Sequence, residues 1–416
     1  MNYKVSVKSM KVTLESSNNR IVVRHFQNKL YETLLCFNIV ISVISQIEQF
    51  SNITRPCMYL GWGVLFAVVC IEKNFKVFCT PNCLHYIAVY ICLVVFSLFV
   101  MIFNNEWSWP NSLNVMIVPI GIMLISSNLA ESRIDNELIY TLTVLYFASS
   151  LFLAIWINVT HFPSFSNWLL AKEYGFPQKN SAAQIWCSAV FLALSFIKPK
   201  SLFQKLLLYM GCGYIIIIVF MSQCRTAILA LGIVTILSIL RKSKRKILWV
   251  LLLIGVFIAL ISIPVVRELL NQALLINKYK GTDLNTFSSG RLDQYLDALK
   301  QFQGTPIIGV GKFYVDCSYI RILTESGIIG FLLIESVWVH QIHINIKRSR
   351  YTVLGDITSL MVAMTAFYII DSFLEGYPPF GPGVSSFMFW FLNGIVGCGL
   401  ANKKALAHYD SKSLGD

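Results

Sequence analysis

The sequence has little charge for its length. Only 13% of its 416 residues are Asp, Glu, Lys or Arg, whereas a soluble globular protein carries about 25%. Hydrophobic residues make up 56% of the chain. This balance excludes an ordinary soluble domain and indicates a membrane protein.

Several catalytic motifs are also absent. The sequence contains no H-E-x-x-H zinc motif, no Walker A phosphate loop, no G-x-S-x-G nucleophile elbow and no D-x-D pair. An ATP-driven step or a metal-dependent transfer from a nucleotide sugar is therefore unsupported, and we expect no metal and no cofactor. The chain also lacks an internal repeat, a low-complexity segment and a soluble domain large enough to fold alone.

Apolar runs long enough to span a membrane recur along the chain. A spanning helix needs about 20 mostly apolar residues, and we expect about twelve such helices. The expected spans are 30–50, 57–71, 84–103, 112–130, 137–157, 182–197, 203–221, 226–240, 246–264, 318–339, 355–375 and 384–401. The first 29 residues are basic and lack the apolar core and cleavage site of a signal peptide, so we expect them to be retained.

The net charge of +13 follows the expected topology. With an even number of spans both termini lie on one side, and the loops there hold most of the Lys and Arg, including RKSKRK at 241–246. Because the side richer in Lys and Arg is cytoplasmic, we expect both termini in the cytoplasm and no nucleic-acid partner. The short loops of the opposite side carry only Arg55, Lys172, Lys179 and Arg225.

The eleven cysteines are scattered and mostly fall within the expected spans. Cys79 and Cys83 in CTPNC lack a third and a fourth ligand, so they make a poor zinc site. Cys224 and Cys317 both fall at the expected outer face, and a disulfide between them stays open, because spacing alone does not support one.

Two of the expected outer loops are long, 158–181 and 265–317. In the second, apolar residues recur at helical spacing, and Ser288 or Ser289 before them and Gly304 and Pro306 after them are typical helix ends. We therefore expect an amphipathic helix of about four turns that rests on the bundle or the membrane surface, and a similar piece at 266–277. The apolar residues are Leu292, Tyr295, Leu296, Leu299 and Phe302.

The predicted organisation has five parts. They are a cytoplasmic tail 1–29, helices within 30–264, a structured outer loop 265–317, helices within 318–401 and a cytoplasmic tail 402–416.

Cations occupy the starts of three spans expected to run inward, at Lys179, Arg225 and Arg321. A helix N-terminus carries partial positive charge, so a cation there is unfavourable unless an anion is nearby. Helix N-termini with basic side chains form phosphate sites. For each residue alone, the alternative to a phosphate site is a long side chain that extends to the membrane interface. Arg291 on the loop helix adds a fourth cation, which favours the phosphate site.

Acids accompany these cations at Asp316, Glu325, Asp371 and Glu375. Ionisable groups in a membrane are rare and usually face a cavity or a partner. Glu325 follows Arg321 by four residues, so an ion pair along one helix face is the simpler interpretation. Asp316 has no such neighbour and is the better candidate for a general base. Together the charges predict an outward-facing cavity suited to a lipid-linked phosphate or diphosphate.

The order of these segments resembles the bacterial O-antigen polymerase and O-antigen ligase superfamily. The resemblance is carried by QKNS before a span, by SQCRTAILAL, and by SSGRLDQYLDALKQFQGTPIIGVGKFYVDCSYIRILTESGIIG. In the family, a large outer loop has an Arg, a short helix and a "pl.G.G" segment, and a polar doublet then leads into a span with "E.G..G". Here these are Arg291, the helix to Phe302, Pro306 to Gly311, Asp316-Cys317 and Glu325 to Gly330. The ligase branch typically shows His-Asn at the doublet, so Asp316-Cys317 resembles the polymerase branch.

The resemblance implies an all-α, GT-C-like polytopic fold in the bacterial cytoplasmic membrane, with the active site outside. The implied reaction moves a growing glycan from undecaprenyl diphosphate to a new lipid-linked repeat unit. Arg225 and Arg291 would hold the donor diphosphate, and Asp316 is a hypothesis for the base that rests on position alone. Membrane lipid, a chain-length regulator and a flippase are the expected partners. The remaining expected substrate-binding residues are Lys179, Asn180, Arg321, Glu325, Asp371 and Glu375.

Two alternatives stay open. One is an O-antigen ligase. The other is a transporter such as a lipid-linked oligosaccharide flippase, which has a similar number of spans. Transporters often place polar residues near the membrane midplane, whereas here the charges gather at the outer ends of spans. The polymer class, whether O-antigen, capsule or exopolysaccharide, also stays open.

Overall fold

A computed structural model describes residues 30–73, 79–104, 110–132, 136–161, 179–242, 246–276, 281–288, 290–348, 355–376, 379–380 and 386–398. These residues form helices joined by turns and contain no strand, so the all-α prediction is confirmed. The predicted tails 1–29 and 402–416 and most of the predicted loop 158–181 lie outside the described residues.

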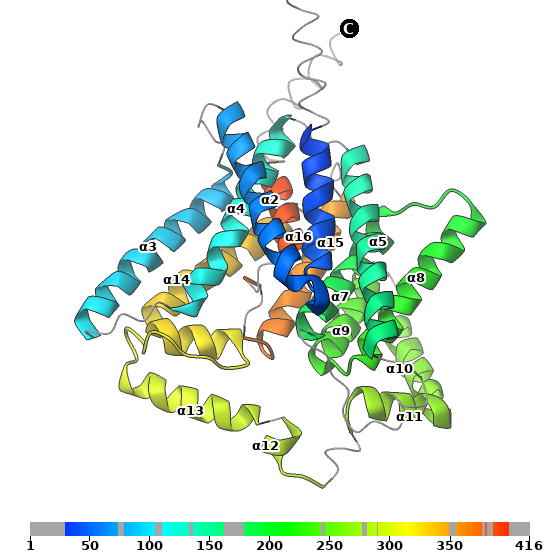
Figure 1. Ribbon diagram of the computed structural model, residues 1–416. Helices are drawn as coiled ribbons and strands as arrows, with labels where there is room; N and C mark the ends of the chain where they lie inside the picture. Colours follow the sequence, from blue (N-terminus) through cyan, green and yellow to red (C-terminus); the bar gives the residue numbers. More distant parts are fainter. Residues whose placement is uncertain are drawn as a thin grey trace, which may run out of the picture.

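The helices follow the expected order (Figure 1). In chain order they are Leu30–Ile44, η1 Glu48–Phe50, α2 Ser51–Glu72, α3 Pro81–Asn104, α4 Asn111–Ser132, α5 Asn136–His161, α7 Lys179–Phe196, α8 Leu202–Met221, α9 Arg225–Lys242, α10 Lys246–Ser262, α11 Pro264–Ala273, α12 Leu284–Phe287, α13 Arg291–Gly304, α14 Ser318–Arg348, α15 Gly355–Ser372 and α16 Phe387–Cys398.

Six of the described helices are long and apolar enough, by length and composition, to cross a membrane. They cover Glu48–Glu72, Cys83–Ile102, Ser112–Leu129, Glu137–His161, Leu202–Met221 and Ser318–Ile346. Each predicted span overlaps a helix, which supports a multi-pass membrane protein. The number of crossings and their direction stay predictions.

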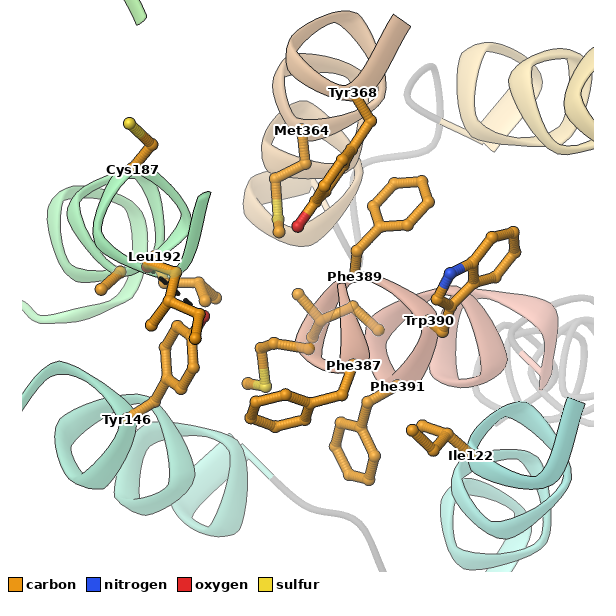
Figure 2. Packing of buried hydrophobic residues seen from close by; sticks show 14 of the residues in the cluster. Ile122, Tyr146, Cys187, Leu192, Met364, Tyr368, Phe387, Phe389, Trp390 and Phe391 are labelled. Carbon is orange, nitrogen blue, oxygen red and sulfur yellow. Dashed lines mark hydrogen bonds between the residues drawn. The ribbon is translucent and has the colours of Figure 1, made fainter. Parts of the chain in front are cut away.

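Helix α16 forms the centre of the bundle and is buried on all sides. Ser386 to Val396 are buried without a break, so this helix has no lipid-facing side. Figure 2 shows Phe387 beside Tyr146 of α5 and Phe389 beside Tyr368 of α15. The Phe389 ring lies 4.9 Å from that of Tyr368, and the Phe387 ring lies 5.5 Å from that of Tyr146. Because lipid is as apolar as these residues, such close van der Waals packing holds the helices together.

Helix α7 is also an interior helix, although its residues are less apolar. The stretch Ser181 to Val190 is buried throughout and is rich in Ala, Ser and Cys. Small residues let helix backbones approach closely, and α7 packs against α5, α8 and α15. The indole Nε1 of Trp186 donates to the Ser150 carbonyl of α5 at 3.1 Å. This packing fixes the start of α7, where Lys179 and Asn180 lie.

Helix α13 confirms the amphipathic helix predicted in the loop, and it lies across one end of the bundle (Figure 1). Its start is marked by Gly290 at φ 80°, and the Ser288 hydroxyl accepts from the Leu292 N–H at 3.3 Å. Ala298 is buried. The bundle covers only part of the predicted apolar side, because Leu292, Leu296 and Leu299 are exposed. Their contact with a membrane surface stays a prediction.

Helix α14 is broken at Gly327, which has φ 61° and ψ −169°. The span predicted at 318–339 lies within a helical stretch that is long and apolar enough to cross a membrane, but that stretch contains this break. The break frees backbone groups, and the loop from Pro306 to Gly311 pairs with them. The N–H groups of Val310 and Gly311 donate to the carbonyls of Thr324 and Glu325 at 2.9 Å, and Ile328 donates to Pro306 at 2.9 Å. Non-helical backbone at membrane depth is tolerated where protein satisfies it in this way.

Two glycines make this contact. A Cβ on Gly327 would lie 2.3 Å from the Ile307 carbonyl oxygen, and one on Gly309 would lie 2.4 Å from the Glu325 carbonyl oxygen. The close neighbour of Gly327 is thus a loop backbone, not a helix. Leu93 of α3 lies 3.7 Å from a Cβ on Gly330, so that glycine does face a helix.

We expect Gly327→Ala to lower the stability of the chain by about 1–3 kcal/mol or more, because its conformation is almost restricted to glycine and the added methyl meets backbone. Gly281→Ala is the matched control, since Gly281 also has a positive φ of 78° but has nothing within 4 Å of a Cβ. Thermal unfolding of the purified variants in one detergent compares them. A loss in Gly327→Ala no larger than that in Gly281→Ala would contradict the close approach.

Candidate active site

Helices α7, α9 and α13 begin at one end of the bundle, where α15 ends. Figure 1 shows α13 crossing this end. The first residues of the three helices are Lys179, Arg225 and Arg291, each a cation. Helix α15 packs against both α7 and α9, and Glu375 follows its last residue, Ser372, by one turn. The structure thus brings together cations and acids from four separate segments.

The carboxylate of Glu375 contacts all three helix starts. Its Oε2 accepts a hydrogen bond from the Asn180 Nδ2 of α7 at 2.8 Å. Its Oε1 accepts from the Thr226 hydroxyl of α9 at 3.4 Å and from the Arg291 Nη2 of α13 at 3.1 Å. Carboxylates are stabilised at helix N-termini by the unpaired N–H groups and the helix dipole. Glu375 is therefore the anion that the three helix starts share.

Arg291 contacts two carboxylates at once. Beside the bond to Glu375, its Nε lies 3.5 Å from the Asp316 Oδ2. The three side chains are 18%, 10% and 28% exposed for Arg291, Glu375 and Asp316, so Asp316 is the most accessible of them. Burial lowers the pKa of Arg291, but Glu375 and Asp316 outweigh that effect and raise it overall. The guanidinium stays charged.

Arg291 favours the ionised form of Glu375, because the two side chains form an ion pair of 3.1 Å and the carboxylate is only 10% exposed.

Asp316 is positioned by its neighbours on both sides. The Tyr314 hydroxyl donates to the Asp316 Oδ1 at 2.8 Å. The Tyr295 hydroxyl of α13 donates to the Asp316 backbone carbonyl at 2.8 Å, and burial raises the pKa of Tyr295 to about 12, so it remains a donor. A Cβ on Gly376 would lie 2.7 Å from the Val315 carbonyl oxygen. This glycine lets the Asp316 segment approach Glu375.

The turn before Arg225 is fixed by long-range contacts. Gln223 has φ 53°, and its side chain donates to the Gln272 carbonyl at the end of α11 at 3.1 Å. The buried Cys224 thiol donates to the Asn180 Oδ1 at 3.3 Å, and burial raises its pKa to about 12. Cys224 and Cys317 are both free thiols, so the disulfide left open by the sequence is not formed. Lys179 and Arg225 are half-buried beside these groups.

Asp371 and the pair Arg321 and Glu325 are placed deeper. Asp371 is buried one turn below Glu375, where the Gln184 amide of α7 donates to it. Arg321 and Glu325 are buried in the first part of α14. Glu325 accepts from the Ser112 N–H at the start of α4 at 3.1 Å, so its hydrogen bond goes to another helix and not along its own. Ser112 is thus an additional partner of Glu325, and the ion pair with Arg321 stays a prediction.

Some residues of this cluster carry no sequence signal. Thr226, Gln184 and Tyr314 are single polar groups whose neighbours are set by the fold. Thr226 and Gln184 reach Glu375 and Asp371 from other helices, and Tyr314 reaches Asp316 from two residues before it. Within the described residues, no group of three or more His, Cys, Asp or Glu side chains is arranged to hold a metal ion.

We expect Arg291→Gln to destabilise the chain by about 1.5–3 kcal/mol, the range for hydrogen bonds to charged groups, because Asp316 and Glu375 then face each other without a cation. Adding Glu375→Gln removes one of the two charges and should recover part of the loss. Thermal unfolding of the single and double variants measures this, with the exposed Arg267→Gln on α11 as control. Equal losses in the single and double variants would show that the charges are not coupled.

A family model described as "O-Antigen ligase" matches residues 210–335. The match spans Arg225, Arg291, Asp316, Arg321 and Glu325. No curated protein matches the chain. The matched segment does not separate polymerases from ligases. Over this segment the chain is therefore similar to the O-antigen polymerase and ligase superfamily, and its all-α fold with several long apolar helices is consistent with that similarity.

Proposed function

We propose that the chain is a polysaccharide polymerase that joins undecaprenyl-diphosphate-linked repeat units. The observation that carries the proposal is the position of Arg291, which lies between Asp316 and Glu375 where three helices begin. Such a cluster offers donors for a diphosphate and a partly exposed carboxylate beside it. The uneven distribution of Lys and Arg supports a site on the outer face of the bacterial cytoplasmic membrane, with both termini in the cytoplasm.

In the proposed reaction, Asp316 takes the proton from a hydroxyl of the incoming repeat unit. That hydroxyl attacks the anomeric carbon of the growing glycan, a new glycosidic bond forms, and the bond from that carbon to the diphosphate breaks. Undecaprenyl diphosphate leaves with the electron pair. Arg225 and Arg291 offset the charge that develops on it, and preorganised cations of this kind are a major source of rate enhancement.

Asp316 suits the role of base because it is the more accessible carboxylate beside Arg291. The Tyr314 hydroxyl binds one of its oxygens, and the other lies 3.5 Å from Arg291. Glu375, in contrast, already accepts from Asn180, Thr226 and Arg291. The other predicted substrate-binding residues divide in the same way. Asn180 contacts Glu375 and Lys179 precedes it, so both are proposed to bind substrate, whereas Arg321, Glu325 and Asp371 are buried and are proposed to support the site.

The ligase alternative has one specific observation in its favour, namely the description of the matching family model. The doublet favours a polymerase, because Asp316-Cys317 stands where the ligase branch typically shows His-Asn. The flippase alternative is weaker, since the ionisable cluster lies at one end of the bundle and a structured outer helix is not needed for alternating access. A flippase and a chain-length regulator are proposed partners.

The glycan profile of a strain that lacks this chain separates the three functions. Loss of a polymerase leaves single repeat units attached to their acceptor. Loss of a ligase leaves polymer on its lipid carrier and none on the acceptor, and loss of a flippase removes even the single units. We expect single attached units. Either of the other profiles would overturn the polymerase proposal.

We expect Asp316→Asn to lower polymer synthesis by about 10²- to 10⁴-fold, the usual contribution of a general base, and to leave single repeat units in cells. Asp297→Asn is the matched control, since Asp297 lies on the exposed side of α13 and is 69% exposed. Both proteins are first compared for membrane abundance and thermal unfolding. Normal polymer length and amount in a stable Asp316→Asn protein would exclude Asp316 as the base.

A further inference from the structure

Glu375 occupies the position that an anionic ligand would take. Its two oxygens accept from a guanidinium, an amide and a hydroxyl, each on the first or second residue of a different helix. A phosphate oxygen accepts hydrogen bonds from the same kinds of group, and both phosphates and carboxylates bind at helix N-termini. The three donors therefore form an anion-binding site, and a side chain of the protein itself fills it.

A diphosphate at this site would have to share donors that already bind carboxylates. Nη2 of Arg291 and Nδ2 of Asn180 are engaged by Glu375, and Nε of Arg291 faces Asp316. A diphosphate that binds at Arg291 would bring further negative charge against the Glu375 carboxylate. Like charges at this range repel, and most strongly where water is excluded. This repulsion favours the displacement of the Glu375 carboxylate from the donors.

We infer that Glu375 is a positioning residue that holds Arg291, Asn180 and Thr226 in place and is displaced from them by the donor diphosphate. This inference rests on the proposed function. Glu375 follows the last residue of α15, and its N–H still bonds to the Asp371 carbonyl at 2.8 Å. The backbone is thus fixed while the side chain has three rotatable bonds, so a rotamer change moves the carboxylate without moving the helices. Glu375 is then neither the base nor a ligand of the sugar.

The test measures the binding of inorganic pyrophosphate to the full chain purified in detergent. If Glu375 fills the site for nine-tenths of the time, removing its charge raises the apparent affinity roughly tenfold. We therefore expect Glu375→Gln to bind pyrophosphate about tenfold more tightly than the native chain. Glu375→Asp has a shorter side chain that reaches fewer of the three donors, and an intermediate affinity is expected; it also serves as the second variant should Glu375→Gln fold poorly.

Asp316→Asn is the matched control. It also removes a carboxylate charge beside Arg291, but the Asp316 side chain is not a partner of Asn180 or Thr226 as Glu375 is. A gain in Asp316→Asn as large as that in Glu375→Gln would show a general charge effect and overturn the displacement. A second outcome would overturn the displacement but leave the diphosphate site in place. In that outcome Glu375→Gln binds pyrophosphate no more tightly than the native chain, and Arg291→Gln does not bind it. If Arg291→Gln binds pyrophosphate as tightly as the native chain, Arg291 does not form a diphosphate site. The proposed function and the displacement of Glu375 are then both wrong.

Discussion

The site depends on the contact between the Glu375 carboxylate and three helix starts. Three positively polarised helix ends with a cation at each first residue would repel one another if nothing negative lay between them. Glu375 supplies that charge through Asn180, Thr226 and Arg291. The same contact joins a loop helix, α13, to α7 and α9. Glu375 therefore acts beside the Tyr295 hydrogen bond to Asp316 in holding the loop helix on the bundle.

The second requirement is the break in α14. A continuous helix would keep the Thr324 and Glu325 carbonyls in its own hydrogen-bond ladder and would leave the loop from Pro306 to Gly311 without these partners. Because α14 breaks at Gly327, the loop bonds to the freed carbonyls of Thr324 and Glu325. The segment from Tyr314 to Cys317 is then short and fixed at both ends. Asp316 is presented beside Arg291 by this arrangement and not by the helix that follows it.

The helices and the identity of the clustered charges could be predicted from the sequence. Long apolar runs predict the helices of the bundle, and the helical spacing of apolar residues around Tyr295 predicts α13. The cations at Lys179 and Arg225 are conspicuous because a helix start disfavours them. These features are local, so each is visible within one window of sequence.

Features that depend on distant partners could not be predicted. Gly327 looks like a helix-packing glycine until Gly309 and Ile307 are known to touch it. Glu325 has an arginine four residues away, yet its hydrogen bond goes to Ser112 at the start of α4. In the same way, no residue near Glu375 in the sequence indicates that Thr226 and Asn180 donate hydrogen bonds to it. Long-range contacts decide which of several polar groups becomes a partner.

The most direct test of the account is an experimental structure of the full chain in a lipid nanodisc with undecaprenyl diphosphate bound. We expect the diphosphate at the starts of α7, α9 and α13, in contact with Arg291, with the Glu375 side chain turned away from that arginine. A diphosphate bound at another part of the molecule, with the contact between Arg291 and Glu375 intact, would contradict it.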